Sequence, residues 1–248
     1  MEKNEWYKDE SFWTAFACVM FDQKRWAEVP GVCDLIEDIL GKPRPGDTPI
    51  LDALCGVGRI STEMASRGYR MTGVDLSPRF LEAARESSAG LDCEFIESDI
   101  RDFSRPGAFK LALNLYNSFG YLESPEEDLR MLQAIRQSLA PGGLFIMQVF
   151  GKETVARDFK DNEWWERDGV TVLAESRVVG AWEGLRSHWR VIDGDRTDEY
   201  GFDQRLYSGS ELRRALEESG FSDVSVHGAL DLRPYDQEAD DLVAIGRA

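Results

Sequence analysis

The sequence predicts an α/β fold, an open sheet that is mostly parallel and carries helices on both faces. The first observation is that apolar, strand-like runs alternate with helical patterns between residues 49 and 150. The second is a change after residue 150 to strand-like runs joined by turns, which predicts an antiparallel β insertion after the fifth strand. The third is the length of 248 residues, which allows one domain with an insertion.

The alternating segment supplies the parallel strands and their covering helices. The expected strands are 49–54, 69–74, 93–96, 111–116 and 144–150. A helix over 58–67 ends at Gly68, and Ser77-Pro78 supplies an N-cap followed by a proline at the first helical position. Ser124-Pro125-Glu126-Glu127 reads as a capping box for a third helix, which stops at Pro141-Gly142-Gly143. Strands separated by capped helices are typical of a parallel sheet covered on both faces.

The flanking segments complete a single domain over 1–248. Helices are expected near 10–28 and 31–41, before the linker Lys42–Asp47, and we interpret residues 1–43 as an N-terminal helical lid. The core then comprises 44–150 and 208–248, and the antiparallel cap comprises 151–207. Three cap strands are expected, and two more strands end the chain. These five strands are 170–179, 185–192, 199–207, 223–229 and 241–246.

Composition excludes several classes of protein. With 29 Lys+Arg against 46 Asp+Glu, the net charge of −17 disfavours a nucleic-acid binder, because phosphate neutralisation supplies most non-specific affinity. No apolar run approaches the ~20 residues of a membrane helix, and the N-terminus does not have the order of a signal peptide. The four cysteines form no CxxC pair, so we expect no metal site and reduced thiols in a cytoplasmic protein.

The informative motif is a strand, a glycine turn and a helix over Leu51–Arg59. Gly56 and Gly58 let the backbone approach a ligand closely, and a helix N-terminus favours polar or anionic groups. Asp75 ends the next strand, where a carboxylate can accept hydrogen bonds from both hydroxyls of a ribose. This half of the fold is therefore predicted to bind a nucleoside.

Two residues indicate which kind of nucleoside binds. A dinucleotide site would carry a third glycine where this chain has Ser61. Asp52, before the glycines, would repel a pyrophosphate but suits a cationic or amino-bearing ligand. S-adenosylmethionine (SAM) has a sulfonium, an ammonium and no phosphate.

At these residues the sequence resembles the class I SAM-dependent methyltransferases, which have a Rossmann-like fold. The resemblance runs from about Ile50 to Val149 and continues in pattern to the C-terminus. The family usually has a glycine where this chain has Leu54. The matching segments are the glycine-rich motif Leu51–Arg59, the acidic position Asp75, the segment Phe95–Ile100, the end of the fourth strand at Leu113–Tyr121, and the turn Leu139–Gly143.

The resemblance implies a set of cofactor-binding residues. Asp99 would accept a hydrogen bond from the adenine amino group, and Ile100 would pack on the ring. The N-terminal lid could supply Tyr7 or Arg25 to the methionine carboxylate; the alternative is that the N-terminal aromatic residues belong to the core. The full expected set is Asp52, Leu54, Gly56, Gly58, Asp75, Leu76, Asp99, Ile100, Asn114, Tyr7 and Arg25.

Methyl transfer from SAM is an in-line displacement that mainly requires positioning and exclusion of water. Tyr116 is a catalytic candidate at the fourth strand's end, and His188 in the cap is the candidate imidazole base, with an exposed strand histidine as the alternative. Asp236 could face the site from the loop before the last strand, with a charged surface loop as the alternative. The expected substrate-binding residues are Asn117, Ser118, Tyr121 and Tyr207.

The sequence therefore predicts an enzyme that moves the SAM methyl group to a nitrogen or oxygen of a small molecule. A nucleic-acid methyltransferase, a nicotinamide-dependent oxidoreductase and a non-catalytic nucleoside-binding module are the alternatives. Asn114–Asn117 lacks the pattern of two prolines followed by an aromatic residue that is found in enzymes that methylate flipped adenine. Asp52 and the absent third glycine argue against a nicotinamide cofactor. The expected partners are a small-molecule acceptor, without nucleic acid or membrane, and the chain is expected to be a monomer or homodimer.

Overall fold

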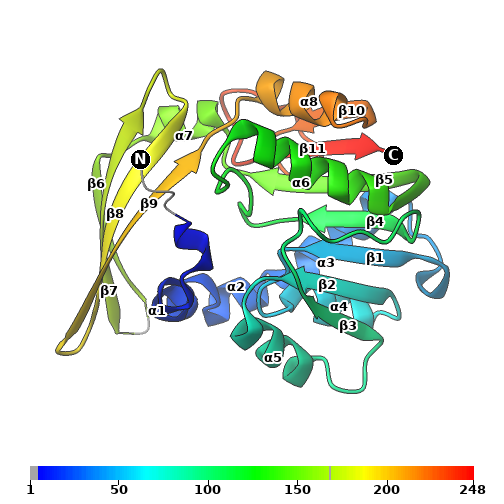
Figure 1. The fold of residues 1–248 in the computed structure, drawn as a ribbon, viewed down its shortest axis with the longest axis horizontal. Helices are drawn as coiled ribbons and strands as arrows, with labels where there is room; N and C mark the ends of the chain where they lie inside the picture. Colours follow the sequence, from blue (N-terminus) through cyan, green and yellow to red (C-terminus); the bar gives the residue numbers. More distant parts are fainter. Residues whose placement is uncertain (1–4, 168) are drawn as a thin grey trace.

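The main unit is a seven-stranded sheet with the order β10-β11-β5-β4-β1-β2-β3 (Figure 1). The structure is a computed structural model that describes residues 5–167 and 169–248, and at residues 18 and 19 it describes the backbone only. Strands β1 to β5 pair in parallel, whereas β11 runs antiparallel to β5 and β10 antiparallel to β11. The strands are β1 (Pro49–Ala53), β2 (Arg70–Asp75), β3 (Cys93–Glu97), β4 (Phe109–Asn114), β5 (Leu139–Val149), β10 (Ser222–His227) and β11 (Leu242–Arg247). The expected open, mostly parallel sheet is confirmed.

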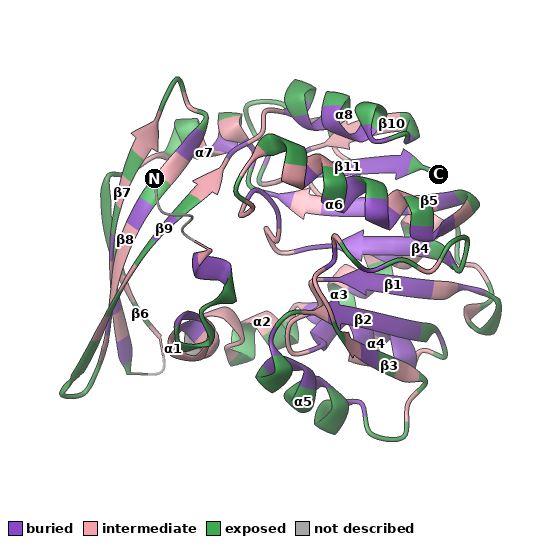
Figure 2. Cartoon of the chain, in the orientation of Figure 1, coloured by how far each residue is buried: buried purple, intermediate pink, exposed green. Residues whose placement is uncertain are grey.

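Helices cover both faces of this sheet. α6 (Pro125–Ser138) and α8 (Gly209–Glu218) contribute to the apolar cluster on one face. α3 (Val29–Leu40) and α4 (Arg59–Ser66) contribute to the cluster on the other face, and α5 (Pro78–Ser87) packs beside α4 against β3. The central strands are buried while the helices expose their outer faces (Figure 2), as the apolar runs and amphipathic patterns predict.

The starts of α5 and α6 follow the predicted serine N-caps, with one difference at α6, and α8 starts in the same way. Ser77, Ser124 and Ser208 each accept a hydrogen bond from a backbone N–H in the first turn of α5, α6 and α8. At α8 the reciprocal bond from Glu211 completes a capping box. At α6 the carboxylate of Glu127 instead binds Arg101, so the predicted capping box there is only half formed.

An antiparallel sheet of four strands in the order β6-β7-β8-β9 stands opposite the carboxyl ends of the main sheet (Figure 1). Its strands are β6 (Asn162–Arg167), β7 (Val170–Val179), β8 (Gly184–Asp193) and β9 (Arg196–Arg205). The expectation of three strands was wrong, because β6 is an edge strand whose exposed residues do not alternate between apolar and polar. The short helix α7 (Lys152–Asp158), which precedes β6, was also not predicted.

The N-terminal segment lies between the two sheets (Figure 1). It consists of the 3₁₀ turn η1 (Trp6–Lys8), α1 (Glu10–Met20) and α2 (Gln23–Ala27), and a second 3₁₀ turn η2 (Pro45–Asp47) lies in the linker. The single helix expected over 10–28 is divided because the carboxylate of Asp22 accepts a hydrogen bond from the Arg25 N–H (2.7 Å) and starts a new helix. The rings of η1 and α1 pack against the inner face of the four-stranded sheet.

β5 begins earlier than the sequence predicts. The Pro141-Gly142-Gly143 turn lies within an irregular first part of the strand that starts at Leu139. The Gly142 N–H donates to the Ala248 carbonyl, and the Ala248 N–H donates to the Gly143 carbonyl (both 2.9 Å). Pairing with the chain end therefore extends the strand through residues that alone would form a turn.

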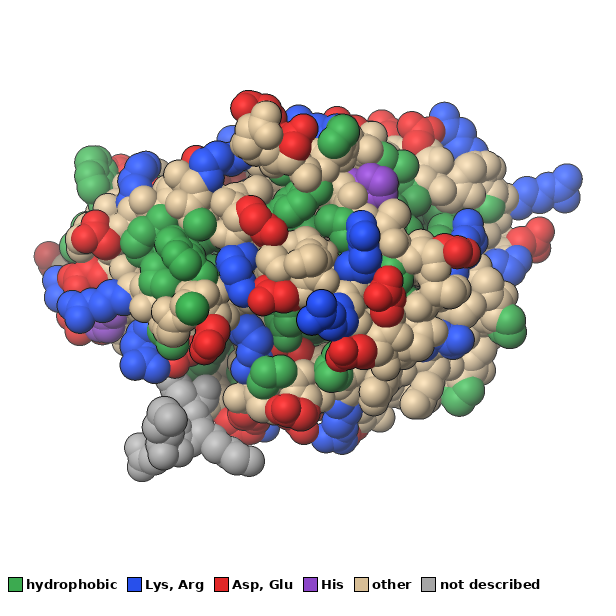
Figure 3. Space-filling view, turned by 90° about the horizontal axis from the view of Figure 1, so that it is seen from above, with side chains coloured by type: hydrophobic (Ala, Val, Ile, Leu, Met, Phe, Trp, Pro, Cys, Tyr) green, Lys and Arg blue, Asp and Glu red, His purple; other side chains and the backbone are tan. Residues whose placement is uncertain are grey.

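The surface shows where the charge surplus lies. On the face in Figure 3, acidic and basic side chains are interspersed, and hydrophobic side chains form patches between them. Several acidic residues occupy helix starts and turns, where they cap backbone N–H groups. On this face, the acidic side chains are therefore dispersed among basic ones and do not form one patch.

Candidate active site

A cavity of about 720 Å³ lies between the carboxyl ends of the parallel strands, the N-terminal helices and the four-stranded sheet. Open α/β sheets bind ligands at this edge, and the volume is that of an ordinary small-molecule site. Thirteen of the residues that the sequence predicts for the site line this cavity. They are Tyr7, Arg25, Asp52, Leu54, Gly56, Asp75, Leu76, Asp99, Ile100, Tyr116, Asn117, Ser118 and Tyr121.

The glycine turn between β1 and α4 forms the floor of the cavity. Leu54, Gly56 and Gly58 all have left-handed backbones, with φ of +61°, +53° and +70°. Leu54 thus takes the conformation that a glycine would adopt readily, and its N–H donates to the Val74 carbonyl (2.8 Å). A Cβ on Gly58 would lie 2.8 Å from the Cβ of Ala84, so Gly58 lets α4 and α5 pack closely beneath the site without itself lining the cavity.

Asp75 is held at the end of β2 by the glycine turn. The Gly56 N–H donates to its Oδ2 (2.8 Å) and the Ser77 N–H donates to its Oδ1 (2.9 Å). Burial raises the pKa of Asp75, while these backbone bonds favour the carboxylate. Each oxygen keeps a lone pair, so the carboxylate can still accept hydrogen bonds from a ligand in the cavity.

Asp52 lies deeper, at the end of β1, with 5% of its surface exposed. Its Oδ2 accepts a hydrogen bond from Ser61 Oγ (2.6 Å). Burial raises the pKa of Asp52 to about 6. Ser61, at the position of the third glycine of a dinucleotide site, therefore holds this carboxylate, whose charge would repel a pyrophosphate.

Asp99 belongs to an ion-pair network at the far end of the cavity. Arg101 Nη2 lies 2.6 Å from Asp99 Oδ2, and Arg101 also contacts Glu123 (3.2 Å) and Glu127 (2.5 Å). Burial raises the pKa of Asp99, but the hydrogen bonds from Arg101 outweigh it and the net pKa is lowered. The hydroxyl of Tyr7 donates to Glu123 (3.1 Å), so Tyr7 lies at this end of the cavity, beside Arg101.

Arg59, the first residue of α4, is a cavity residue that the sequence analysis missed. It is 6% exposed, its Nη1 donates to the Arg25 carbonyl (2.8 Å), and its guanidinium lies 4.4 Å from the centre of the Tyr116 ring. Among the described residues it forms no salt bridge, and burial lowers its pKa. Its position directly after Gly58 was the available signal, because the first residue of this helix must lie beside the glycine turn.

The loop after β4 forms the middle of the cavity wall. Tyr116 and Asn117 have φ of +58° and +64°, which is uncommon for asparagine and costly for a bulky residue such as tyrosine. Tyr121 donates to the Asn117 carbonyl (2.5 Å). Asn114 does not line the cavity; its Nδ2 donates to the carbonyls of Ala53 (3.2 Å) and Ser118 (3.1 Å) and ties this loop to β1.

Besides Gly58 and Asn114, three more predicted residues are not among those that line the cavity. His188 lies next to Trp189 on β8, and successive side chains of a strand point to opposite faces, so His188 faces away and contacts Glu199 (3.4 Å). Asp236 is exposed and accepts a hydrogen bond from the Glu238 N–H (2.9 Å).

Tyr207, the third of these residues, belongs to a buried network outside the cavity. Its hydroxyl donates to Asp128 Oδ2 (2.7 Å), and Arg205 pairs with the same oxygen. Burial raises the pKa of Asp128, and burial together with Asp128 raises the pKa of Tyr207. The network joins the end of β9 to α6, which gives Tyr207 a structural place.

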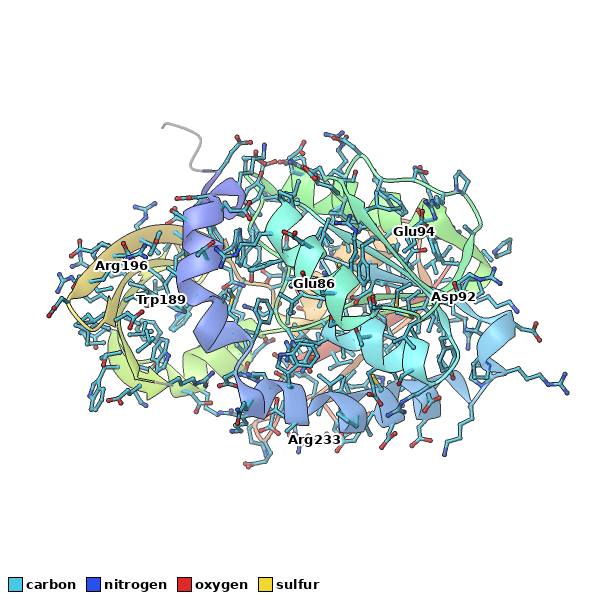
Figure 4. All side chains as sticks on the ribbon, turned by 90° about the horizontal axis from the view of Figure 1, so that it is seen from below. Glu86, Asp92, Glu94, Trp189, Arg196 and Arg233 are labelled. Atoms are coloured by element: carbon cyan, nitrogen blue, oxygen red, sulfur yellow. The ribbon has the colours of Figure 1, made fainter. Side chains whose placement is uncertain are left out.

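The wall opposite the main sheet is aromatic. Trp165 and Trp189 line the cavity from the four-stranded sheet, where Trp189 lies beside α1 (Figure 4). The Trp189 ring lies 5.1 Å from that of Phe16. The cavity also contains an acid that the sequence analysis missed. Asp241 lines the cavity just before β11, where Gln148 Nε2 donates to its Oδ2 (2.7 Å). The signal was its place before an antiparallel last strand, which starts at the edge where the parallel strands end.

Residues 5–167 and 169–248 contain no group of three or more His, Cys, Asp or Glu side chains that could hold a metal ion. In the same residues, no helix is long and apolar enough to cross a membrane.

Comparison with known proteins agrees with this geometry. A family described as "Methyltransferase domain" matches residues 50–143. The dTDP-3-amino-3,4,6-trideoxy-alpha-D-glucopyranose N,N-dimethyltransferase of Streptomyces venezuelae is 27% identical over 161 residues, which cover 64% of this chain and 67% of that protein. The glycine/sarcosine N-methyltransferase of Aphanothece halophytica is 25% identical over 207 residues, or 82% of this chain and 77% of the relative. The CcbJ methyltransferase from Streptomyces caelestis has the same fold, with a TM-score of 0.75 at 19% identity over 89% of this chain and 90% of that structure.

The chain has the Rossmann-like α/β fold of these methyltransferases. The family match over residues 50–143 and the similar proteins support a SAM-dependent methyltransferase enzyme of class I.

Proposed function

We propose that the chain binds SAM along the carboxyl ends of β3, β2 and β1 and transfers its methyl group to a nitrogen or oxygen of a small molecule. The observation that carries the proposal is the row of carboxylates Asp99, Asp75 and Asp52 at consecutive strand ends beside one cavity. These carboxylates suit the adenine amino group, the ribose hydroxyls and the positively charged methionine part. Arg59 is a buried guanidinium without a carboxylate partner among the described residues, so it suits the methionine carboxylate together with Arg25.

The residues that face the reacting atoms need to position and shield them. SAM, when bound, supplies an activated methyl group and its own leaving group. The chain must hold the acceptor in line and exclude water, which can supply several kcal/mol of the barrier reduction. The strained loop at Tyr116 and Asn117 lies between the proposed cofactor half and the aromatic wall, where an acceptor would meet the methyl group.

We further propose that the segments act as separate parts of one domain. The core 44–150 and 208–248 would hold SAM, while the lid 1–43 and the cap 151–207 would cover the acceptor. The packing of η1 and α1 on the four-stranded sheet supports this division. The two curated relatives described above act, by their names, on amino groups of small molecules, which supports a small-molecule acceptor here.

The alternatives fit this cavity less well. A nicotinamide dinucleotide would bring a pyrophosphate over Asp52, whose carboxylate is held by Ser61. A nucleic-acid substrate would have to reach a cavity that the lid and cap cover, on a chain with a net charge of −17.

The test compares SAM affinity in Asp75→Ala with that in Asp92→Ala, a control that removes an exposed carboxylate. Loss of two charge-assisted hydrogen bonds should weaken SAM binding about 100-fold or more in Asp75→Ala, while Asp92→Ala should leave it unchanged. Unchanged affinity in folded Asp75→Ala would show that the ribose lies elsewhere. Incubation with methyl-labelled SAM and metabolite fractions should then transfer label to a small molecule and not to RNA or DNA.

A further inference from the structure

We infer that the methyl acceptor is an amine, which binds as an ammonium to Asp241 and Gln148 at the end of the cavity away from the adenosine site. This inference deepens the proposed function and rests on it. It selects nitrogen over oxygen and adds a catalytic residue, Asp241.

The position of Asp241 follows from the sheet topology. Leu242 pairs with Val149 and Val243 pairs with Gln148, so the start of β11 lies beside the end of β5. In the order β11-β5-β4-β1, Asp241 stands three strand spacings from Asp52, or about 14 Å. The acids Asp75 and Asp99 lie still further along the same edge. Asp241 therefore lies beyond the proposed cofactor residues, on the acceptor side of the cavity.

The hydrogen-bonding groups at this place fit a donor with several N–H groups. Gln148 Nε2 donates a hydrogen bond to Asp241 Oδ2 (2.7 Å), and Asp241 Oδ1 accepts no hydrogen bond from the described residues. Gln148 Oε1 is buried and also has no hydrogen-bond partner among the described residues. Both side chains line the cavity. An ammonium offers three N–H donors to such a pair of free acceptors, whereas a hydroxyl offers one.

The charged neighbours leave the negative charge of Asp241 available. Arg25 pairs with Glu28 (3.3 Å), and Arg167 pairs with Asp22 (3.1 Å). The nearby Arg233 pairs with Asp240 on the surface. Arg25 and Arg233, the cations whose charges act on Asp241, thus have carboxylate partners of their own.

The aromatic wall adds to the preference for a cation. Trp165, Trp189, Phe16 and Phe150 line the same cavity. Ring faces attract a cation when solvent is excluded, and they also favour an apolar body attached to it. The cavity therefore suits an amine carried on a ring or another apolar skeleton.

The chemistry of a carboxylate also selects an amine. The ammonium gives one proton to Asp241, and the freed nitrogen lone pair forms the N–C bond with the methyl carbon while the C–S bond breaks. The sulfonium becomes a neutral thioether, the nitrogen carries the positive charge, and the proton on Asp241 leaves to solvent. A carboxylate is too weak a base to remove an alcohol proton at a useful rate, since efficiency depends on matched pKa values.

The experiment measures binding of 2-phenylethylamine and 2-phenylethanol, which share one skeleton, to protein saturated with S-adenosylhomocysteine. Wild type should bind the amine at least about tenfold more tightly, the effect of one charge-assisted hydrogen bond. Asp241→Asn should reduce the preference to about twofold or less, and Gln148→Met should reduce it in part. Asp236→Asn, which makes the same charge change at an exposed residue of the same loop and leaves the pair of Arg233 with Asp240 intact, should keep the preference.

The outcomes separate this inference from the proposed function. Binding of S-adenosylhomocysteine with no preference for the amine, or with a preference that survives in Asp241→Asn, would overturn the inference alone. Failure of S-adenosylhomocysteine to bind would overturn the proposed function and the inference with it. If Asp241→Asn does not fold, an undiminished preference in Gln148→Met overturns the inference and a reduced one supports it.

Discussion

Replacement of Asp52 by asparagine should stabilise the ligand-free protein at neutral pH. Burial raises the pKa of Asp52 from 3.8 to about 6, so the folded state holds its proton more tightly than the unfolded state does. The stability that the Asp52 carboxyl contributes is fully present below its unfolded-state pKa of 3.8 and is lost as the pH rises through its folded-state pKa of about 6. Two pKa units correspond to about 3 kcal/mol above about pH 7. Asparagine does not ionise, so the variant avoids this loss.

The assay is urea unfolding of wild type and Asp52→Asn from about pH 4 to about pH 8. The difference in unfolding free energy should grow by about 2.5 kcal/mol across this range, which is about 5–10 °C in Tm. Any pH-independent effect of the substitution, such as a changed bond to Ser61, only offsets the whole curve. A difference that stays constant over this range would refute the reasoning about the Asp52 environment. Asp92→Asn, an exposed control, should give a nearly flat difference.

Three further substitutions test other parts of the structure. Gly58→Ala, at φ +70°, places a Cβ 2.8 Å from the Cβ of Ala84 and should lower the unfolding free energy by about 2–4 kcal/mol in thermal unfolding. The control Gly90→Ala, at φ +83° in open space, should lower it by about 1 kcal/mol. Equal losses in the two variants would contradict the close packing of α4. Asp128→Asn should cost about 3–5 kcal/mol in urea unfolding because Arg205 loses its buried counter-charge, and a loss below about 1 kcal/mol would argue against this network. His188→Ala should leave kcat/KM within about twofold for any acceptor found, because the imidazole faces away from the cavity, and a drop of about 100-fold would restore it as the base.

Local sequence patterns predicted the part of the cavity that we propose binds the cofactor. A strand followed by a glycine turn fixes where Gly56 lies, and a residue that ends the neighbouring parallel strand must lie at the same sheet edge. Asp52 and Asp75 were therefore predictable from chain order alone, and the structure places both beside the cavity. Leu54 itself adopts the αL conformation, so the turn forms without a glycine at this position.

The cavity residues that we propose bind the acceptor could not be predicted in the same way, because their positions depend on tertiary packing. Which face of β8 meets the lid decides between Trp189 and His188, and strand alternation alone leaves both choices open. Likewise, Asp241 and Asp236 lie in one charged loop, and only the pairing of β11 with β5 shows which of them reaches the sheet edge. The exposed residues of β6 do not alternate between apolar and polar, so the sequence analysis predicted one cap strand too few.

The central claim is that this cavity binds SAM and not a dinucleotide. The most direct measurement is the thermal stability of the protein with SAM, with S-adenosylhomocysteine and with NAD, each at a hundredfold excess over its dissociation constant or at a matched millimolar concentration. SAM and S-adenosylhomocysteine should each add about 2.7 kcal/mol of stability, a rise in Tm of about 5–11 °C, and NAD should add none. A shift with NAD and none with either SAM compound would contradict the account.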